Sequence, residues 1–369
     1  MRSRSLARPW LLPLTPIYRL ALAVREMRLR HGWEPVRRLR FPVISIGNLS
    51  TGGAGKTPFA IALAKSLSAS GFDVDVLSRG YGRKNEVPSR VAPSGAAEEF
   101  GDEPLLIARE AGFPVYVARE RYQAGRLAEA KSRQNENRPV IHILDDGFQH
   151  RQLFRDVNIL LLNSDDWRDR LLPAGNLREP LAAAERADVI AIPNSEPDLE
   201  AELRAWGWGG PVWLARRQMD VPRVEGPVVA FCGIARAGQF FDGLEAAGLR
   251  LARRIVFRDH HRYSAGDVLQ LENAARAAGA GTLVTTAKDK VRLRQGVAES
   301  AKPGDEGPWS PTLSTKNVER RGHGRSPADS NPSRVEFLTA GLRIEIQDAE
   351  AALRWLADRL SRAPVAPSL

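Results

Sequence analysis

One short segment combines glycine, lysine and threonine at a spacing suited to binding phosphate: Ser50, Thr51, Gly52, Gly53, Ala54, Gly55, Lys56 and Thr57. Glycines let backbone amides approach phosphate oxygens closely, and the start of a following helix favours negative charge. Lys56 can reach the β- and γ-phosphates of a nucleotide, and Thr57 can bind Mg²⁺. An apolar run at 43–46 and a helical pattern that begins with Pro58 flank the segment, as such a loop requires. We therefore predict an ATP-binding P-loop, although the strict motif would have glycine in place of Ser50.

A pair of aspartates gives a second sign of nucleotide chemistry. Asp145 and Asp146 directly follow 140–144, an apolar run with the composition of a buried strand. P-loop proteins hold magnesium with a carboxylate at the end of a strand, so the pair would face the same crevice as the loop. The structural alternative is that both aspartates cap the next turn through side-chain hydrogen bonds. The two motifs together predict Thr57, Asp145 and Asp146 as metal ligands and leave open which aspartate contacts Mg²⁺.

The chain around these motifs alternates short apolar runs with helical stretches, which is the pattern of a parallel sheet with crossover helices. Strands are expected at 42–46, 74–78, 140–144, 157–162 and 189–192, and a second set at 228–232, 254–257 and 283–286. Helices are expected at 239–247, 265–278 and 349–360, and a strand or hairpin at 335–346. The predicted fold class is α/β, with a P-loop NTPase-like parallel-sheet domain, a second, smaller α/β domain and an N-terminal amphipathic helix.

This order of elements predicts three regions. Residues 1–40 form a basic amphipathic segment, 41–220 the P-loop core domain and 221–369 the second α/β domain. Within the last region, 296–334 is rich in Pro, Gly, Ser and charged residues and has almost no apolar periodicity. We expect a disordered insertion there.

The net charge of +10 is concentrated at the N-terminus. Residues 1–40 hold ten arginines against Glu26 and Glu34, so this segment carries about +8 and the remainder is nearly neutral. A helical pattern places Trp10, Leu14, Tyr18 and Ala21 on one side of this segment. One basic arm beside apolar residues favours an anionic membrane surface as partner, and not nucleic acid. The alternative is a helix packed on its own domain.

The cysteine content and the length of the apolar runs indicate the cellular compartment. A single cysteine, Cys232, excludes an internal disulfide and is typical of a reducing compartment. Prolines and Arg19 interrupt the apolar N-terminal stretch, which argues against a signal peptide, and no run reaches the roughly 18 apolar residues that span a bilayer. The expected location is therefore peripheral, at a membrane facing the cytoplasm.

Eight motifs occur in an order that resembles the tetraacyldisaccharide 4′-kinase (lipid A 4′-kinase) family, over residues 1 to about 295. They are 52–58 (GGAGKTP), 78–83 (SRGYGR), 101–104 (GDEP), 145–150 (DDGFQH), 173–180 (PAGNLREP), 231–235 (FCGIA), 259–261 (DHH) and 286–289 (TAKD). The resemblance implies transfer of the ATP γ-phosphoryl group to the 4′-hydroxyl of a tetraacylated glucosamine disaccharide phosphate. It also implies the cytoplasmic face of a Gram-negative inner membrane, ATP and Mg²⁺ as cofactors, a lipid substrate, and no obligate protein partner.

The resemblance also assigns roles to single residues. Asp102 matches the family's catalytic aspartate, and a histidine of the second domain is expected to act with it, with His260 favoured over His261. Arg178 and Glu179 match residues near the phosphates, so Arg178 joins Lys56 in the expected catalytic set. The expected nucleotide or substrate contacts are Tyr81, Arg119, Arg121, Gln149 and Lys288.

A membrane-associated nucleotide-switch ATPase is the competing interpretation. Such proteins also join a P-loop to a basic amphipathic helix, but they usually carry lysine immediately before the paired glycines, where this chain has Thr51. A switch protein would also leave the motifs at 101–104 and 259–261 without a purpose. The sequence therefore favours a lipid kinase.

Overall fold

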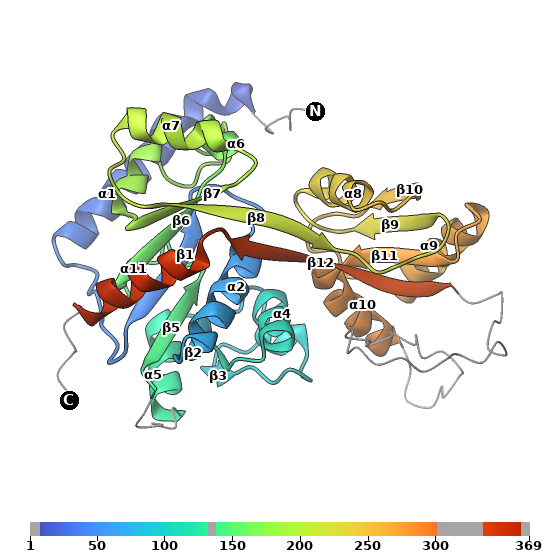
Figure 1. The fold of residues 1–369 in the computed structure, drawn as a ribbon, viewed down its shortest axis with the longest axis horizontal. Coiled ribbons are helices and arrows are strands. Elements are labelled where there is room, and N and C mark those ends of the chain that lie inside the picture. Colours follow the sequence, from blue (N-terminus) through green and yellow to red (C-terminus); the bar gives the residue numbers. More distant parts are fainter. Residues whose placement is uncertain (1–7, 132–137, 301–334, 363–369) are drawn as a thin grey trace. The chain divides into compact units, whose positions relative to one another are not determined.

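The computed structural model of the protein describes residues 8–131, 138–300 and 335–362. The chain divides into two compact units (Figure 1). Unit 1 comprises the described residues up to 218 together with those from 343 onward, and unit 2 comprises those between 219 and 342. The first boundary lies close to the expected join at 220. The C-terminal helix, which we expected in the second domain, belongs instead to unit 1.

Unit 1 is built on a mostly parallel sheet. Its strands, in spatial order, are β8 (Val212–Asp220), β7 (Val189–Pro193), β6 (Val157–Leu161), β1 (Val43–Asn48), β5 (Val140–Asp145), β2 (Asp73–Ser78), β4 (Val115–Val117) and β3 (Ser89–Arg90). Neighbouring strands are parallel except for β3 and β4. Every residue of β1 and β5 is buried, because central parallel strands are covered on both faces. The predicted α/β fold with a parallel P-loop sheet is confirmed.

Helices cover this sheet. They are η1 (Pro9–Leu14), α1 (Thr15–Arg30), α2 (Lys56–Ala69), α3 (Ala97–Phe100), α4 (Asp102–Ala111), α5 (Arg121–Lys131), α6 (Ser164–Trp167), η2 (Leu181–Arg186), α7 (Pro197–Trp206) and α11 (Ala349–Ser361). α2 buries Phe59, Leu63 and Leu67 at four-residue steps, and it contacts β1, β5, α4 and α11. α2 and α11 lie in front of the sheet in Figure 1.

Unit 2 has a smaller parallel sheet and its own core. Its strands, in spatial order, are β10 (Leu251–Val256), β9 (Val228–Cys232), β11 (Thr282–Thr286) and β12 (Glu336–Ile346). Its helices are α8 (Ala237–Ala246), α9 (Ala265–Ala277) and α10 (Ala287–Ser300). α9 begins with a capping box in which Ser264 and Asp267 each bind the other's backbone N–H. Two apolar clusters, one around Phe241 and one around Phe231, fill its interior.

The structure departs from the sequence-based expectation at several elements. β3, β4 and β8 were not predicted, and residues 335–346 contain a single strand, β12, and no hairpin. α10 continues to Ser300, past the point at 296 where the disordered insertion was expected to begin. The rest of that expected insertion, 301–334, lies outside the described residues.

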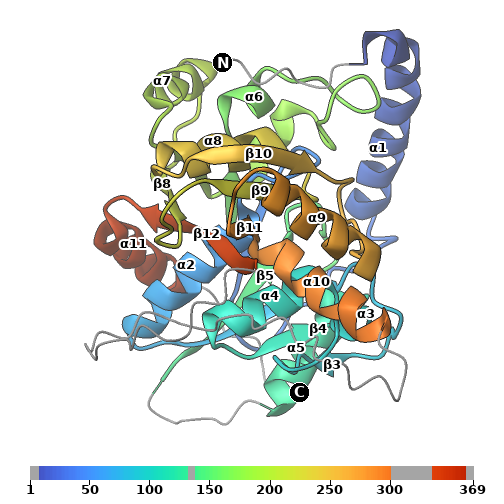
Figure 2. The ribbon, with the colours of Figure 1, turned by 90° about the vertical axis from the view of Figure 1, so that its right-hand side faces the viewer.

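The N-terminal amphipathic helix is present, but its faces differ from the prediction. A 3₁₀ turn, η1, precedes α1, and α1 turns Tyr18 and Leu22 toward a buried cluster of unit 1. The opposite face of α1 leaves Ile17, Leu20 and Val24 exposed, with Leu20 at 65%. Figure 2 shows α1, in dark blue, along the outer side of unit 1. The packed-helix alternative therefore describes one face of α1, and an exposed apolar stripe remains on the other.

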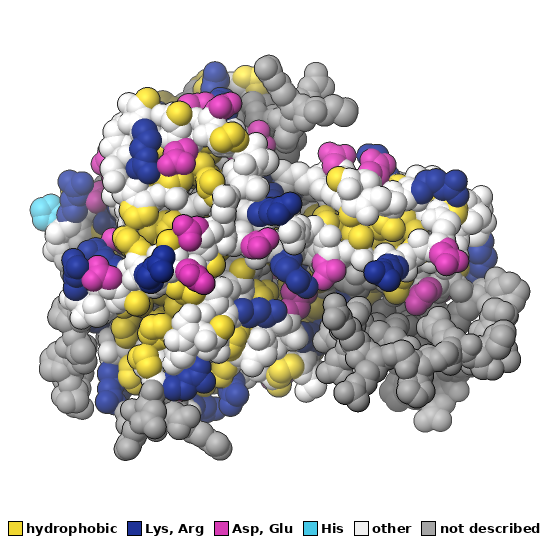
Figure 3. All heavy atoms as spheres, viewed as in Figure 1, with side chains coloured by type: hydrophobic (Ala, Val, Ile, Leu, Met, Phe, Trp, Pro, Cys, Tyr) yellow, Lys and Arg dark blue, Asp and Glu magenta, His cyan; other side chains and the backbone are white. Residues whose placement is uncertain are grey.

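The surface shows no single-sign field on the face drawn in Figure 3. Lys and Arg side chains are interspersed there with Asp and Glu side chains. Within the described part of the chain, none of the helices has the length and apolar character needed to cross a bilayer.

Candidate active site

The loop between β1 and α2 has the backbone that phosphate binding needs. Gly52 and Gly55 have φ of 99° and 83°, in the left-handed region that favours glycine. A β-carbon at Gly53 would meet nothing within 4 Å, so that side of the loop is open. α2 begins at Lys56, directly after Gly55, and its first backbone N–H groups are therefore free of intrahelical partners. This arrangement suits an anion at the start of the helix.

Ser50, the departure from the strict motif, has a structural role. It is fully buried, and its hydroxyl oxygen accepts a hydrogen bond of 3.0 Å from Asn48 Nδ2. Its backbone forms a bridge with Leu177, and the next residue, Thr51, donates its N–H to the carbonyl of Asn176 over 2.8 Å. Ser50 thus helps to join the loop to the segment that carries Arg178.

Asn48, the last residue of β1, lies at the centre of the site. Its Oδ1 accepts hydrogen bonds from Lys56 Nζ at 2.9 Å and from Arg178 Nη2 at 2.6 Å. Its backbone carbonyl accepts from Gln149 Nε2 at 2.8 Å. The side chains of Lys56, Arg178 and Gln149, which were predicted from three separate motifs, therefore meet at Asn48, which was not predicted.

Asp146 adds the negative charge to this cluster. Its carboxylate lies 3.5 Å from Lys56 Nζ and 3.2 Å from Arg178 Nη2. Asp146 directly follows β5, and its backbone has φ of 49°. Burial would raise the pKa of this carboxyl, but Lys56 and Arg178 outweigh it and lower the pKa to about 2. Asp146 is therefore ionised at neutral pH and holds both cations at the mouth of the loop.

The oxygen donors near the loop fit Mg²⁺. Among the described residues, no group of three or more His, Cys, Asp or Glu side chains is arranged to hold a metal. A P-loop site does not need one, because Mg²⁺ keeps several waters and takes only one or two carboxylates beside phosphate oxygens. Thr57 and Asp145 are both buried, Thr57 in the first turn of α2 and Asp145 at the end of β5, next to Asp146. Their hydroxyl and carboxylate oxygens are the hard ligands that this ion prefers.

A cationic group extends the site from Asp146 toward α5. Arg121 is only 8% exposed. Burial and the nearby Arg79 lower the pKa of its guanidinium to about 10, whereas Asp146 acts to raise this pKa. Burial and then Arg121 and Arg155 lower the pKa of His150 to about 3, so this histidine is neutral. Positive charge therefore exceeds negative charge around His150, as expected where an anionic substrate binds.

The structure separates Arg119 from Arg121. The Arg119 side chain is 69% exposed and lies 3.4 Å from Glu86. Its expected role in substrate binding stays a prediction, whereas the electrostatic coupling of Arg121 to Asp146 links that residue to the site.

Asp102 begins α4, next to the motif that carries Tyr81. The residue before it, Gly101, has φ of 90°, and a β-carbon there would come within 3.0 Å of Gly80 and of the Tyr81 carbonyl. Glycine is thus required for the two motifs to touch. Tyr81 itself is 75% exposed. The fold brings together the motifs at 78–83 and 101–104, which are separate in the sequence.

A cavity adjoins the loop on the side of β6, β7 and β8. Its polar lining residues are Asn163, Asp166 and Arg217, and its other lining residues, which include Ala54, Gly55, Pro193 and Ala215, are glycine or apolar. Arg217 Nη2 donates a hydrogen bond of 3.0 Å to the carbonyl of Ala54. The cavity opens at the carboxyl ends of parallel strands, where open α/β sheets bind ligands.

Comparison with known proteins decides the family. The family model for tetraacyldisaccharide-1-P 4′-kinase (LpxK) matches residues 7–314. This chain belongs to the tetraacyldisaccharide 4′-kinase family. The family resemblance inferred from the eight motifs is confirmed.

Two relatives and one solved structure show how much of the chain the likeness to this kinase family covers. The tetraacyldisaccharide 4′-kinase of Koribacter versatilis is 41% identical over 292 residues, which cover 76% of this chain and 88% of the relative. That of Chromobacterium violaceum is 36% identical over 305 residues, with coverage of 79% and 85%. The crystal structure of LpxK from Aquifex aeolicus in complex with ATP matches with a TM-score of 0.69 at 30% identity. That match covers 96% of this chain and 99% of the other.

The two candidate histidines of this kinase have different surroundings within unit 2. His260 has φ of 60°, and its Nδ1 accepts a hydrogen bond of 3.0 Å from Arg292 Nη2. His261 instead places Nε2 3.2 Å from an Asp267 carboxylate oxygen and stacks on Phe257 with ring centroids 4.6 Å apart. The ring of His261 is thus already used in packing.

A buried pair supports His260. Arg292 is 4% exposed and donates to the Gly233 carbonyl at 2.9 Å and to Asp289 Oδ1 at 3.3 Å. Asp289 is fully buried and also accepts from the Thr286 hydroxyl at 2.6 Å. Because a guanidinium can only donate, His260 Nδ1 must be the acceptor, which leaves any ring proton on Nε2.

Two expected site residues, Glu179 and Lys288, are not among the residues whose contacts form the Asn48 cluster. Glu179 is buried and its carboxylate is bound by Arg186 and Arg25. Lys288 lies in the first turn of α10, in unit 2. The expected roles of both in binding nucleotide or substrate stay predictions.

Sequence reasoning missed Asn48, Arg217 and Arg292. The available signal for Asn48 was a polar residue at the end of a buried strand, two positions before the glycine-rich loop. Arg217 and Arg292 gave no such signal, because Arg217 contacts Ala54, and Arg292 contacts His260 and Gly233, across long distances in the sequence.

Proposed function

We propose that this chain transfers the γ-phosphoryl group of ATP to the 4′-hydroxyl of a tetraacyldisaccharide 1-phosphate at a membrane surface. The observation that carries this proposal is the cluster in which Asn48 binds Lys56 and Arg178 beside the ionised Asp146. Membership of a family of tetraacyldisaccharide 4′-kinases supplies the substrate.

The residues of unit 1 divide the work of binding and transfer. The loop amides and the start of α2 hold the phosphates, and Lys56 and Arg178 stabilise charge on the phosphoryl group in transit. Thr57, Asp145 and Asp146 would hold Mg²⁺, which when bound would neutralise charge on the β- and γ-phosphates. The cavity beside Ala54 and Arg217 is the place that we assign to the nucleoside end.

A base must receive the proton of the attacking 4′-hydroxyl. We assign this role to Asp102, supported by its match to the family motif and by its position at the start of α4 beside the Tyr81 motif. We assign to His260 of unit 2 the role of acting with Asp102, since its neighbour His261 is held by Asp267. With Nδ1 accepting from Arg292, any ring proton of His260 is on Nε2, which lies 4.0 Å from Asp259 Oδ1, and this N–H is the donor that we assign to the pairing with Asp102.

A lipid substrate lies in a membrane, and we assign to α1 the role of binding that membrane. The exposed stripe of α1, Ile17, Leu20, Val24 and Met27, recurs at three- and four-residue steps, and Arg28 and Arg30 lie in the last turn of the helix. Such a helix lies in the interface of an anionic bilayer. We propose peripheral attachment at the cytoplasmic face of the inner membrane.

The decisive experiment is transfer of radiolabelled phosphate from [γ-³²P]ATP to tetraacyldisaccharide 1-phosphate in detergent micelles with Mg²⁺. Wild-type protein should label the lipid, and Asp102→Ala should lose turnover far more than ATP affinity. His260→Ala should lose more turnover than His261→Ala. Folded wild-type protein that leaves the lipid unlabelled would exclude the proposed function, and equal losses of turnover and ATP affinity in Asp102→Ala would show a structural role for Asp102.

A further inference from the structure

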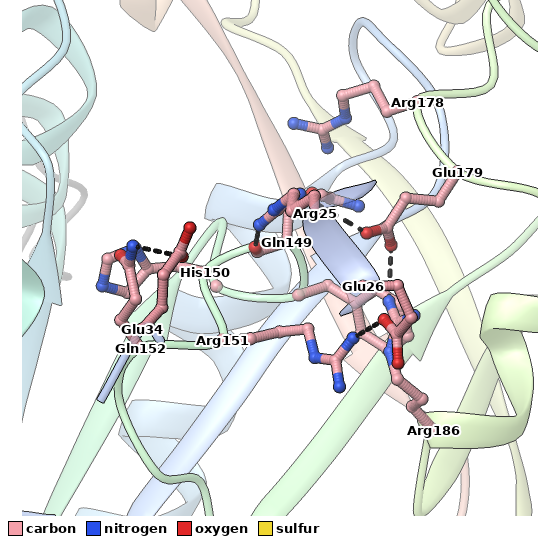
Figure 4. A network of polar contacts seen from close by, with 12 residues as sticks. Arg25, Glu26, Glu34, Gln149, His150, Arg151, Gln152, Arg178, Glu179 and Arg186 are labelled. Atoms are coloured by element: carbon pink, nitrogen blue, oxygen red, sulfur yellow. Dashed lines mark hydrogen bonds and ion pairs between the residues drawn. The ribbon is translucent and has the colours of Figure 1, made fainter. Parts of the chain in front are cut away.

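The inner face of α1 contacts the two segments that hold the phosphate site (Figure 4). Tyr18 Oη donates a hydrogen bond of 2.9 Å to the backbone carbonyl of Arg178. Arg25 donates from Nη2 to the backbone carbonyl of Gln149. Tyr18 and Arg25 are seven residues apart, about two helical turns, so they project from the same face. One helix face thus reaches the backbone at Arg178 and Gln149, two of the three residues whose side chains donate hydrogen bonds to Asn48.

Charge pairing strengthens this attachment. Arg25 Nη1 lies 3.7 Å from Glu179 Oε1, and Arg186 binds the other oxygen of the same carboxylate. The next residue of the helix, Glu26, pairs with Arg151. Because the Glu179 side chain is only 8% exposed, its charge needs these partners, and removing one of them leaves a buried charge partly unpaired.

The position of these backbones decides the geometry of the phosphate site. Arg178 uses one guanidinium for both Asn48 Oδ1 and the Asp146 carboxylate, and Gln149 reaches the Asn48 carbonyl. A planar guanidinium binds two acceptors only from a narrow range of positions. A shift of about 1 Å in such a group can lower a rate on the order of a hundredfold.

We propose that Tyr18 and Arg25 are positioning residues for phosphoryl transfer, since they fix the backbone at Arg178 and Gln149. The inference rests on the proposed kinase function of this site. The helix that presents its outer face to lipid therefore also holds the site at which ATP reacts. Neither residue touches the reacting atoms.

The test compares variants of the two faces of α1 in the full-length protein. We expect Arg25→Ala to lower kcat about 5–20-fold and Tyr18→Phe about 3–5-fold at saturating ATP and lipid in detergent micelles. KM for the lipid should change less than twofold, and Arg25→Lys should recover part of the loss. Arg19→Ala is the matched control, because Arg19 is an exposed arginine of the same helix, and it should keep the wild-type kcat.

The outcomes separate positioning from anchoring. If Arg25→Ala and Tyr18→Phe keep the wild-type kcat and raise only KM, α1 acts as a surface anchor and the inference is wrong. If Arg25→Ala fails to fold, Tyr18→Phe decides, because it removes a single hydroxyl. If the wild-type protein does not phosphorylate the lipid, the proposed function fails. In that case the affinity for ATP, measured without lipid, tests the inference. The affinity should be weaker in Arg25→Ala than in wild type and unchanged in Arg19→Ala. Equal affinities of Arg25→Ala and wild type would overturn the inference.

Discussion

Asn48 connects residues that lie in three different motifs. A neutral amide can accept from Lys56 and Arg178 at its oxygen while its nitrogen donates to Ser50. An aspartate at this position would add a second negative charge beside Asp146, and a leucine would leave both cations with one acceptor fewer. The amide therefore fixes two cations without competing with the phosphates for them.

Replacement of Asn48 by alanine should weaken the site without removing a charge. We expect Asn48→Ala to lower kcat/KM for ATP about 10–100-fold, because two charge-assisted hydrogen bonds are lost. Steady-state kinetics with varied ATP measures this change. Asn158→Ala on the neighbouring strand β6 is the control, since Asn158 pairs with Asp188. An unchanged kcat/KM in Asn48→Ala would show that Lys56 and Arg178 are positioned by other contacts.

His150 should make folding stability depend on pH. Its pKa is lowered to about 3 in the folded protein, mainly by burial and then by Arg121, from an ordinary value of 6.5. Between these two pH values the unfolded chain binds one proton more, so the free energy of unfolding rises with pH there. The slope from this one group is at most about 1.4 kcal/mol per pH unit.

Chemical denaturation of His150→Gln across pH 4 to 6.5 tests this expectation. The variant should show a shallower rise of unfolding free energy with pH than wild type. His31→Gln is the matched control for the loss of an imidazole, because His31 is an exposed histidine. Equal slopes for wild type and His150→Gln would mean that His150 titrates alike in the folded and unfolded states.

The residues of the loop were predictable because their chemistry is local. Glycines at positive φ, a following lysine and a helix start lie within eight consecutive positions. The pairing of Arg25 with Glu179 was not predictable, because the two residues are 154 positions apart. Long-range pairing of charges depends on the tertiary fold, which the pattern of one segment does not contain.

At the scale of elements, buried strands were predicted best. β1, β5 and β9 are rich in apolar residues, and the structure buries every residue of each. β8 was missed because its exposed positions include Arg216 and Gln218, so the apolar run ends after Ala215. A strand that is partly exposed carries a weaker signal than one covered on both faces.

The faces of α1 were predicted wrongly for a geometric reason. Trp10 and Leu14 were placed on one side with Tyr18 under the assumption of a single α-helix. The structure has a 3₁₀ turn from Pro9 to Leu14, with Pro13 inside it, before α1 begins. Three residues per turn, in place of 3.6, rotate the first residues relative to the rest.

The outer face of α1 should set the affinity for membranes. The double variant Ile17→Gln, Leu20→Gln exchanges two exposed apolar side chains for polar ones. Since burying such a side chain contributes about 1.5–3 kcal/mol, the loss of partial burial at two positions should weaken binding at least about tenfold. Sedimentation with anionic lipid vesicles measures the change.

Leu269→Gln is the matched control for that measurement. Leu269 is a leucine of α9 in unit 2 with 56% exposure, against 65% for Leu20. It should bind vesicles as wild type does. Vesicle binding that survives in the double variant, or that is lost equally in the control, would contradict attachment through α1.

The whole molecule contains two units with separate cores. Unit 1 holds the clusters around Leu160 and Leu144, and unit 2 holds those around Phe241 and Phe231. The chain passes from unit 1 to unit 2 within β8 and returns within β12. The sequence indicated the first of these crossings, but the return places α11 in unit 1 and was not predicted, because an amphipathic helix does not specify which sheet it covers.

Separate cores predict two unfolding transitions, of which nucleotide shifts only one. The P-loop lies in unit 1, so ATP with Mg²⁺ at 100 times its Kd should stabilise that unit by about 2.7 kcal/mol and raise its Tm by about 5–10 °C. Seven of the eight tryptophans belong to unit 1, and the eighth, Trp309, lies outside the described residues, so Trp309→Phe makes fluorescence report on unit 1 alone. Calorimetry on the same protein follows both units. Lys56→Ala should abolish the shift and leave the other transition in place, whereas one coincident transition that moves as a whole with ATP would show that the two units unfold together.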